Sequence, residues 1–208
     1  MTDLRDGARA LGLELDATQA ALLIAHLDLV DEWGERMNLT AIRERPQQIT
    51  KHVLDSLSAA SWLRGTRVAD VGSGAGFPGI PLAIVRPDVQ FSLVESTGKK
   101  CRFLEHVRDT LGLANVQVVQ ARAEAYTPDV RFDTVLARAV GPLVDLVRNS
   151  GGLVAAGGRL LAMKGRYPED ELTKKLNGWK VIAVHPLRVP GLDEERHLVE
   201  LARSHEKV

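Results

Sequence analysis

The chain has a single cysteine, no long hydrophobic run and no excess of charge of either sign. Cys101 alone excludes an intramolecular disulfide and any metal site built from a cysteine cluster, and the histidines show no metal-ligand spacing. No apolar run reaches the roughly 18 residues of a membrane span, and residues 1–6 lack the basic and apolar regions of a signal peptide. We therefore expect a cytoplasmic protein with neither a bound metal nor a membrane contact.

The charges balance overall but not along the chain. With 27 Lys and Arg residues against 27 Asp and Glu residues, the formal net charge is zero, so there is no overall attraction for nucleic acid. Residues 1–66 carry seven basic and ten acidic residues, which leaves a net charge of +3 for the remainder. A nucleic-acid partner would therefore need a local basic surface in the second part of the chain.

The first 66 residues are expected to form a helical extension. Apolar residues recur there at helical spacing, namely Leu11, Leu15, Leu22, Leu23, Leu27 and Val30. Asp16 or Thr18 is suited to cap this helix, and Pro46 is suited to open a further one. His52 and Asp55 stand three residues apart on the second helix, so they are predicted to form a structural pair rather than an acid–base dyad.

From residue 67 onward, short β-type runs alternate with helical segments. The expected strands are Arg67–Val71, Gln90–Glu95, Val116–Gln120, Phe132–Arg138, Gly158–Lys164, Lys180–Val189 and His197–Ala202. The expected helices are Pro81–Val85, Lys99–Leu111, a short piece containing Ala123, Leu143–Val154 and Glu169–Leu176. The alternation predicts an α/β domain over residues 67–208, with a mostly parallel sheet and helices on both faces. A short connection at Pro190-Gly191 predicts a hairpin that places the last strand antiparallel at the sheet edge.

The most informative segment runs from Val68 to Pro81 and reads V-A-D-V-G-S-G-A-G-F-P-G-I-P. Asp70 sits in a strand candidate that leads into Gly72, Gly74 and Gly76 and then a helix start, which is typical of the first βα turn of a nucleotide-binding domain. The G-x-G-x-G spacing differs from the G-x-G-x-x-G of dinucleotide sites. A nearby carboxylate suits a ligand with an ammonium and a sulfonium, which is S-adenosylmethionine, better than it suits a pyrophosphate. A tight turn without a ligand is the alternative that we consider less favoured.

Further candidates follow the later strands. Glu95, 23 residues after Gly72, is placed to accept hydrogen bonds from ribose hydroxyls. The turn Ala121–Glu124 would flank an adenine, with Glu124 accepting from its amino group, although a helix start with an acid in its first turn explains these residues equally well. Arg138 ends the fourth strand, where it would engage guanine O6 or a phosphate or form a surface ion pair.

The sequence around Arg138 limits which atoms of a base could accept a methyl group. The Asp/Asn-Pro-Pro-aromatic motif of enzymes that methylate exocyclic amines is missing, and Cys101 lies away from the place that C5-pyrimidine methylation requires, so we expect it to be a packing residue. Guanine N7 has a lone pair and no proton, so its methylation needs only alignment of donor and acceptor. We therefore expect no catalytic residue beyond groups that position the substrates, such as Arg138 and Lys164.

Basic residues gather at the same expected edge of the sheet. They are Lys99, Lys100, Arg102, Arg122, Arg138, Lys164 and Arg166. The first three begin a helix, where cations oppose the helix dipole, and a phosphate partner would account for that placement. Together these residues would form a rim that binds RNA phosphates, with solvated surface charge as the alternative for each of them.

The chain resembles the bacterial ribosomal RNA small-subunit methyltransferase G family, also called the glucose-inhibited division protein B family. The segments that carry the resemblance are Met37–Ile42 (M-N-L-T-A-I), His52–Leu57 (H-V-L-D-S-L), Asp70–Pro81, Val94–Lys100, Arg122–Glu124, Arg138–Val140 and Lys164-Gly165. They occur in order between residues 37 and 165, and the sequence Gly-Phe-Pro-Gly-Ile-Pro at 76–81 is the most distinctive of them.

This resemblance implies a class I (Rossmann-like) methyltransferase fold with an N-terminal helical extension. It implies methyl transfer from S-adenosylmethionine to N7 of a guanine in 16S ribosomal RNA, in the 530 loop near the decoding site of the small subunit. By match to the family motifs, the residues expected to contact the cofactor are Gly72, Phe77, Ala123, Glu124 and Arg138. Arg196, beyond the matching segments, is a candidate RNA contact.

Two other classes of function fit parts of the pattern. One is a methyltransferase that acts on a small molecule or a protein, for which the basic rim would be irrelevant. The other is a non-catalytic ribosome-binding module whose cofactor site regulates assembly. An NAD oxidoreductase fits least well because of the glycine spacing and Asp70. A monomer is the expected state, with 16S ribosomal RNA within the small subunit as its partner.

Overall fold

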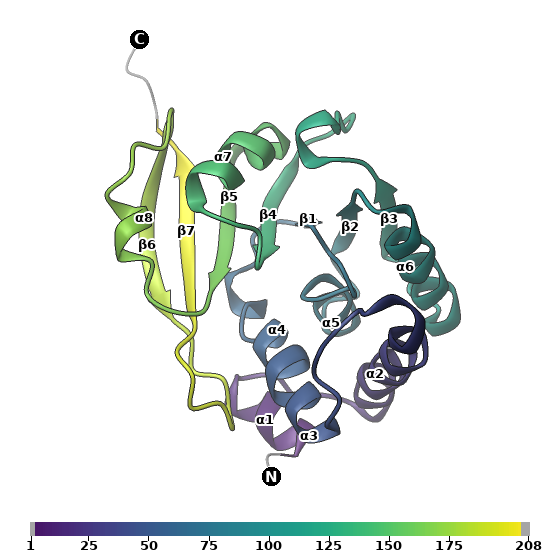
Figure 1. The fold of residues 1–208 in the computed structure, drawn as a ribbon. Coiled ribbons are helices and arrows are strands. Elements are labelled where there is room, and N and C mark those ends of the chain that lie inside the picture. Colours follow the sequence, from purple (N-terminus) through teal and green to yellow (C-terminus); the bar gives the residue numbers. More distant parts are fainter. Residues whose placement is uncertain (1–2, 205–208) are drawn as a thin grey trace.

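The computed structural model describes residues 3–204, which form a seven-stranded sheet between two layers of helices (Figure 1). The strands run in the order β3-β2-β1-β4-β5-β7-β6. Their bounds are β1 Arg67–Val71, β2 Gln90–Glu95, β3 Val116–Gln120, β4 Phe132–Arg138, β5 Val154–Lys164, β6 Trp179–Pro186 and β7 His197–Arg203. β1 to β5 are parallel, and β7 is antiparallel to both of its neighbours.

The helices are short except for α2 and α6. The α-helices are α1 Leu4–Ala10, α2 Ala17–Met37, α3 Arg45–Gln48, α4 Asp55–Leu57, α5 Gly79–Val85, α6 Gly98–Leu111, α7 Leu143–Ser150 and α8 Glu169–Leu172. A π-helical segment, Ile49–Leu54, joins α3 to α4, and 3-10 turns occupy Ala60–Trp62, Ala123–Ala125 and Gly151–Leu153. The structure of the described residues contains no helix with the length and apolar character needed to cross a membrane.

The helical prediction for the N-terminal part is confirmed, and its capping is specific. Asp16 caps α2: its carboxylate accepts from Gln19 N at 2.7 Å, while Gln19 Oε1 accepts from Asp16 N at 3.2 Å. This reciprocal capping box satisfies backbone donors that a helix start leaves free. The helix ends at Met37 and is followed by its C-cap Asn38, whose φ of +50° is left-handed. Pro46 stands in the first turn of α3, as the sequence predicts.

The first four strands have the predicted bounds, whereas the C-terminal pair differs in order. β7 lies between β5 and β6, so the outermost strand is β6, and residues 187–196 form a long connection rather than a tight hairpin. Burial explains the order, since Leu198, Val199 and Leu201 of β7 are fully buried while β6 is only partly covered. In Figure 1 this connection extends from the yellow-green strands to the N-terminal helices, where Lys51 Nζ meets Glu194 Oε1 at 2.6 Å.

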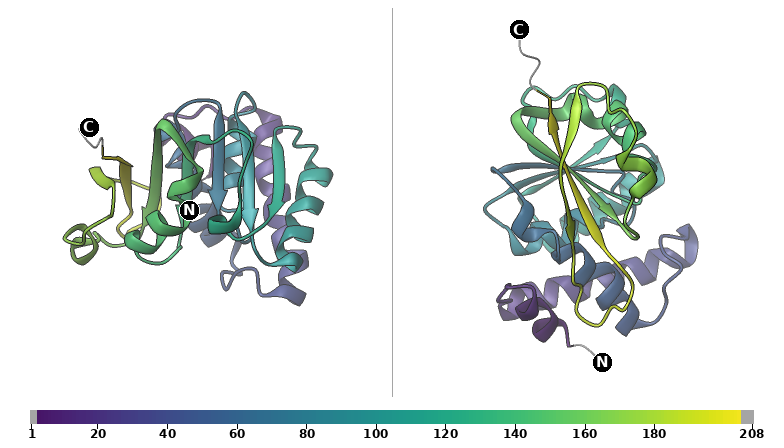
Figure 2. Two further views of the ribbon diagram at one scale, coloured as in Figure 1. Left: turned by 90° about the horizontal axis from the view of Figure 1, so that it is seen from above. Right: turned by 90° about the vertical axis from the view of Figure 1, so that its left-hand side faces the viewer.

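Side chains of alternate strand residues enter cores on opposite faces of the sheet, as a pleated strand requires. Leu93 and Leu136 join the core formed with α1, α2, α5 and α6, while Val94 and Val135 join the core beneath α7. The right-hand view of Figure 2 shows the N-terminal helices on one side of the fanned strands and α7 on the other. The helices before residue 66 thus share a core with the sheet. That residues 1–66 and 67–208 are separate domains stays a prediction.

Candidate functional site

The glycine-rich turn between β1 and α5 exposes backbone where most turns expose side chains. Gly72, Gly74 and Gly76 have φ angles of +71°, +57° and +87°, the left-handed region that glycine adopts without strain. A Cβ at Gly72 would lie 3.0 Å from Val140 Cγ2, and one at Gly76 would lie 2.7 Å from Ile80 Cγ1. Both conformation and space therefore restrict these two positions to glycine.

Asp70 lies beneath this turn rather than on its surface. The side chain is fully buried; Oδ2 accepts from Gly79 N at 2.9 Å, and Oδ1 is buried with no hydrogen-bond partner among residues 3–204. Burial raises the pKa of Asp70 to about 6. Asp70 therefore holds the start of α5 from beneath the turn.

Glu95, at the end of β2, braces the turn from the neighbouring strand. It is 6% exposed; Oε2 accepts from Gly74 N at 3.1 Å, and Oε1 accepts from Thr97 N at 2.8 Å. A carboxylate has about four lone-pair sites, so each oxygen keeps acceptor capacity after these two bonds. Cys101 Sγ donates to the carbonyl oxygen of Glu95 at 3.2 Å and is buried, which confirms its expected packing role.

Phe77, which follows the turn, is held between two histidines and an arginine. Its ring lies 4.6 Å from that of His26 and 4.7 Å from that of His52, measured between centroids. The guanidinium carbon of Arg138 lies 5.4 Å from the Phe77 centroid, within reach of a cation–π interaction. This cluster fixes the position of Arg138 next to the glycine turn.

Both histidines of the cluster are neutral at physiological pH. Burial lowers the pKa of His26 to about 4, although its ring is hydrogen-bonded to the carbonyl oxygen of Ala75 at 2.9 Å. Burial, followed by the charge of Arg138, lowers the pKa of His52 to about 4. His52 Nε2 is paired with Thr40 Oγ1 at 2.7 Å. The two imidazoles therefore pack as polar but uncharged rings.

Acidification is expected to destabilise the fold through His26. Its pKa is 6.5 in the unfolded chain and about 4 in the folded one, so between these values the unfolded state binds more protons and stability falls as pH falls. From pH 7 to pH 5 this linkage costs about 2 kcal/mol. We expect His26→Gln, which retains a donor for Ala75, to remove that part of the pH dependence in urea titrations.

The measurement compares the variant with the unsubstituted protein, because other buried groups titrate in the same range. His52 acts in the same direction as His26, whereas Asp70, with its raised pKa, favours the folded state at low pH. Both contributions are common to the two proteins and cancel in the difference. Parallel pH profiles for His26→Gln and the unsubstituted protein would show that folding does not lower the pKa of His26.

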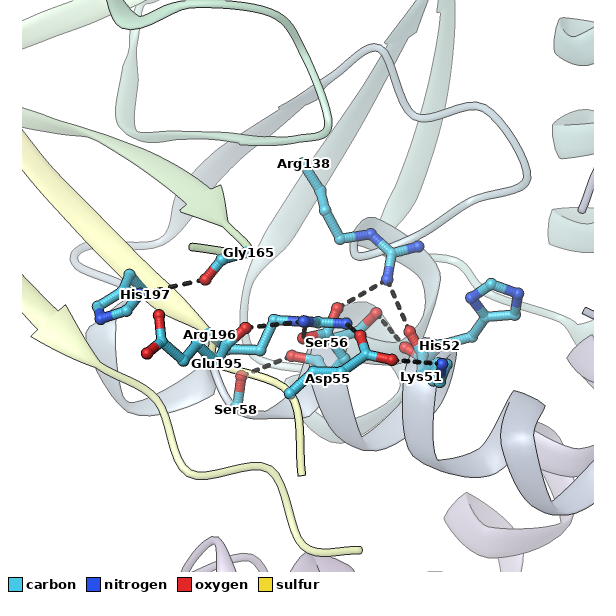
Figure 3. Close-up of polar contacts among 11 residues, drawn as sticks. Lys51, His52, Asp55, Ser56, Ser58, Arg138, Gly165, Glu195, Arg196 and His197 are labelled. Atoms are coloured by element: carbon cyan, nitrogen blue, oxygen red, sulfur yellow. Dashed lines mark hydrogen bonds and ion pairs between the residues drawn. The ribbon is translucent and has the colours of Figure 1, made fainter. Parts of the chain in front are cut away.

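Arg138 and Arg196 are joined by one buried carboxylate, that of Asp55 (Figure 3). Asp55 is 3% exposed; Oδ2 lies 2.9 Å from Arg138 Nη1, and Oδ1 lies 3.2 Å from Arg196 Nε. Arg138 Nη1 also donates to the carbonyl oxygen of Lys51 at 3.2 Å. The predicted pairing of His52 with Asp55 is wrong: His52 points to Thr40, because the π-helical segment before α4 changes the helical register.

The other candidates at this edge divide into exposed and paired residues. Lys99, Arg122, Glu124 and Arg166 are exposed and Lys100 and Ala123 are half-buried; Arg122 lies 4.0 Å from Glu124. Lys164 is only 16% exposed, and its Nζ contacts Glu171 at 2.9 Å and donates to the carbonyl oxygen of Gly141 at 2.7 Å. Arg196 also contacts Glu194 at 3.0 Å. Lys164 and Arg196 thus hold loops in addition to any contact with a ligand.

Sequence reasoning missed two contributors from the helical extension. His26 supports the glycine turn through the carbonyl of Ala75, and Asp55 holds the two arginines. His26 lies on the apolar stripe of its helix, which marks it as buried but not as a partner of the turn. Asp55 is an acid among apolar residues in V-L-D-S-L, and that unusual burial was the available signal.

Comparison with known proteins identifies a family for the chain. The family model described as rRNA small subunit methyltransferase G matches residues 19–199. A ribosomal RNA small subunit methyltransferase G from Nitrosococcus oceani is 48% identical over 95% of this chain and 92% of its own. One from Azoarcus sp. is 49% identical over 97% of this chain and 95% of its own.

Solved structures show the same fold at low identity. A glycopeptide N-methyltransferase, MtfA, complexed with S-adenosyl-L-methionine has a TM-score of 0.63 at 13% identity, over 74% of this chain and 87% of that one. A ribosomal protein L11 methylase from Lactobacillus delbrueckii has a TM-score of 0.55 at 16% identity, over 79% and 81%. The predicted Rossmann-like methyltransferase fold is confirmed, and the chain belongs to the rRNA small subunit methyltransferase G family.

Proposed function

We propose that this protein transfers a methyl group from S-adenosylmethionine to N7 of a guanine in 16S ribosomal RNA, in the 530 loop of the small subunit, as a cytoplasmic monomer. The observation that carries the proposal is the near full-length similarity to proteins named ribosomal RNA small subunit methyltransferase G. The glycine turn, Glu95 and Arg138 lie together at the carboxyl ends of β1, β2 and β4, where open α/β sheets bind ligands.

The residues at this edge fit the chemistry of S-adenosylmethionine. Glu95 keeps acceptor capacity for two ribose hydroxyls after bracing the turn. Gly72 and Gly74 present backbone to the methionine portion, and the 3-10 turn of Ala123 and Glu124 lies past the end of β3, where it would flank the adenine. Phe77 orients Arg138 over its ring, and Asp70 and Gly76 shape the turn from below.

Arg138 is suited to bind the carboxylate of the donor. Its Nη1 is used by Asp55 and Lys51, while Nε and Nη2 have no protein partner within residues 3–204 and are not enclosed. A guanidinium with one side held and the other open presents a preformed fork to a carboxylate. This supports a cofactor role for Arg138 ahead of a direct RNA role.

In the proposed reaction, the side chains need only align the methyl donor with the acceptor nitrogen. The cofactor supplies a methyl group on a sulfonium, which is an activated leaving group. The lone pair of guanine N7 forms the new bond to the methyl carbon as the carbon–sulfur bond breaks, and no proton leaves N7. The pKa of each histidine beside the turn is lowered to about 4, which makes both imidazoles weak bases at pH 7, and Arg138 and Arg196 are paired with Asp55. Such a site is consistent with catalysis by proximity rather than by a general base.

Binding of RNA is assigned to the exposed cations around this edge. Lys99, Arg102, Arg122 and Arg166 are exposed and Lys100 is half-buried. Each neutralised phosphate adds to affinity in a salt-dependent way. Lys164 and Arg196 would contact RNA while they stay paired with their carboxylate partners, Glu171 for Lys164 and Asp55 and Glu194 for Arg196. The small number of accessible cations favours a substrate that is already folded, such as an assembling subunit.

The test is a methyl-transfer assay with labelled S-adenosylmethionine, using small subunits and deproteinised 16S RNA from cells that lack this protein. Mass spectrometry of the product is expected to show one 7-methylguanine in the 530 loop. Glu95→Gln, which removes the ribose acceptor charge, is expected to weaken cofactor binding about tenfold or more. Methyl groups on a protein, on a small molecule or on another base atom would contradict the proposal, as would tight RNA binding without turnover.

A further inference from the structure

The loop between β4 and α7, residues 139–142, closes over the glycine turn. A Cβ at Gly72 would lie 3.0 Å from Val140 Cγ2, so the side chain of Val140 packs directly on that glycine. Arg138, the residue before this loop, is the one proposed to bind the carboxylate of the donor. Since Gly72 is proposed to face the methionine portion of the donor, the conformation of this loop decides whether that portion fits.

The loop has a backbone conformation that its own sequence does not stabilise. Ala139 and Gly141 have φ angles of +58° and +52°, and this left-handed region is unfavourable for alanine. Ala139 is exposed, so packing of its side chain does not compensate. Pro142 precedes α7 and gives its first turn no side-chain cap, although the N–H groups at a helix start need acceptors. Contacts from another part of the chain must therefore hold the loop.

An ion pair between β5 and α8 supplies these contacts. Lys164, the last residue of β5, donates from Nζ to the carbonyl oxygen of Gly141 at 2.7 Å and lies 2.9 Å from Glu171 Oε2. The same carboxylate accepts from Leu143 N, the first N–H of α7, at 2.5 Å. Lys164 and Glu171 are only 16% and 24% exposed, which limits the screening of the pair by solvent. Glu171 thus holds the loop at both ends, directly at Leu143 and through Lys164 at Gly141.

We propose that Glu171 is a positioning residue for the methyl donor, because it holds the β4–α7 loop in the conformation that closes on the methionine portion. The inference rests on the proposed donor site at the glycine turn and adds a residue that does not touch the donor. Within residues 3–204, the Glu171 carboxylate forms hydrogen bonds only with Lys164 and Leu143. Figure 1 shows α8 on the side of β6, away from α5 and the glycine turn. Glu171 therefore acts on the donor through the loop alone.

Two ligands that share an adenosine portion separate this role from a general structural one. S-adenosylhomocysteine has the amino-acid portion of the donor, whereas 5′-methylthioadenosine lacks it. The adenosine portion is assigned to Glu95, which ends β2, and to the turn at Ala123 and Glu124, which follows β3. Glu171→Ala is expected to weaken binding of S-adenosylhomocysteine about tenfold. The Kd of 5′-methylthioadenosine, measured by calorimetry in the same way, is expected to stay within about twofold.

Two further substitutions on α8 complete the test. Glu171→Gln keeps an oxygen acceptor for Leu143 N and Lys164 Nζ but loses the charge, so it is expected to bind S-adenosylhomocysteine about threefold more weakly than the unsubstituted protein. If Glu171→Ala does not fold, this variant serves as the test, again with 5′-methylthioadenosine as the comparison. Glu169→Ala is the matched control, since Glu169 is exposed on the same helix and its carboxylate has no hydrogen bond within residues 3–204. It is expected to bind both ligands as the unsubstituted protein does.

The outcomes separate this inference from the proposed function. A folded Glu171→Ala protein that binds S-adenosylhomocysteine as tightly as Glu169→Ala overturns the positioning role. So does an equal loss for S-adenosylhomocysteine and 5′-methylthioadenosine, because it indicates a structural effect on the whole site. An unsubstituted protein that binds neither ligand refutes the proposed donor site. One that binds S-adenosylhomocysteine but does not methylate 16S RNA refutes the proposed function, while a selective loss in Glu171→Ala would still establish the positioning role.

Discussion

Replacement of Asp55 by alanine is expected to cost about 3 kcal/mol of stability and to weaken cofactor binding about tenfold or more. The carboxylate is 3% exposed and accepts from Arg138 and Arg196, whose side chains are each 19% exposed. Its removal leaves Arg138 without its carboxylate partner and leaves Arg196 with only the exposed Glu194. Breaking a buried ion pair from one side is costly for that reason, and Arg138 would lose the contact that orients it.

A second acid on the helical extension provides the control. Asp28 also contacts an arginine, Arg45, but its side chain is 61% exposed, so Asp28→Ala is expected to change stability by less than about 1 kcal/mol. Stability is measured by urea unfolding, and cofactor affinity by calorimetry at a temperature where all variants are folded. Asp55→Asn, which keeps the shape and one acceptor, should recover part of the affinity. A folded Asp55→Ala protein with unchanged cofactor affinity would show that Asp55 is structural only.

The sequence predicted the parts of the fold that local patterns determine. β1, β2 and β4 have the predicted bounds because each is a largely apolar run that ends at a polar residue or before a glycine, and these inner parallel strands are buried on both faces. The edge strand β3 reads V-Q-V-V-Q and is only partly buried, and its valines still mark its bounds. The cap at Asp16 also follows from local chemistry. The glycine turn could be predicted for the same reason, since positive φ angles at three alternating residues leave few other choices than glycine.

Features that depend on distant residues could not be read in this way. Asp55 meets Arg138 and Arg196 across 83 and 141 residues of sequence, and nothing near Asp55 in the chain indicates either partner. The helix that carries it changes from α to π and back within residues 45–57, so a spacing of three residues did not place His52 and Asp55 together. The order of β6 and β7 likewise depends on which strand is buried, because both can form the same antiparallel pair.

Replacement of Gly76 by alanine is expected to destabilise the protein by about 3 kcal/mol and to abolish cofactor binding at ordinary concentrations. The φ of Gly76 is +87°, which costs an L-residue about 1 kcal/mol or more. A Cβ there would lie 2.7 Å from Ile80 Cγ1, 3.2 Å from His26 Nε2 and 3.3 Å from Leu104 Cδ2. These contacts are side chains of a packed core, so the turn has to move away from them.

Gly112→Ala separates the two causes, because it has the strain without the crowding. Gly112 follows α6 with a φ of +64°, and a Cβ there would have no atom within 4 Å. We expect it to cost about 1 kcal/mol and to leave cofactor affinity unchanged. The excess loss in Gly76→Ala, read from the two urea midpoints, then measures how tightly His26, Ile80 and Leu104 close on the turn. Equal losses in the two variants would mean that the turn adapts freely, and the argument that the helical extension holds the cofactor site in shape would fail with it.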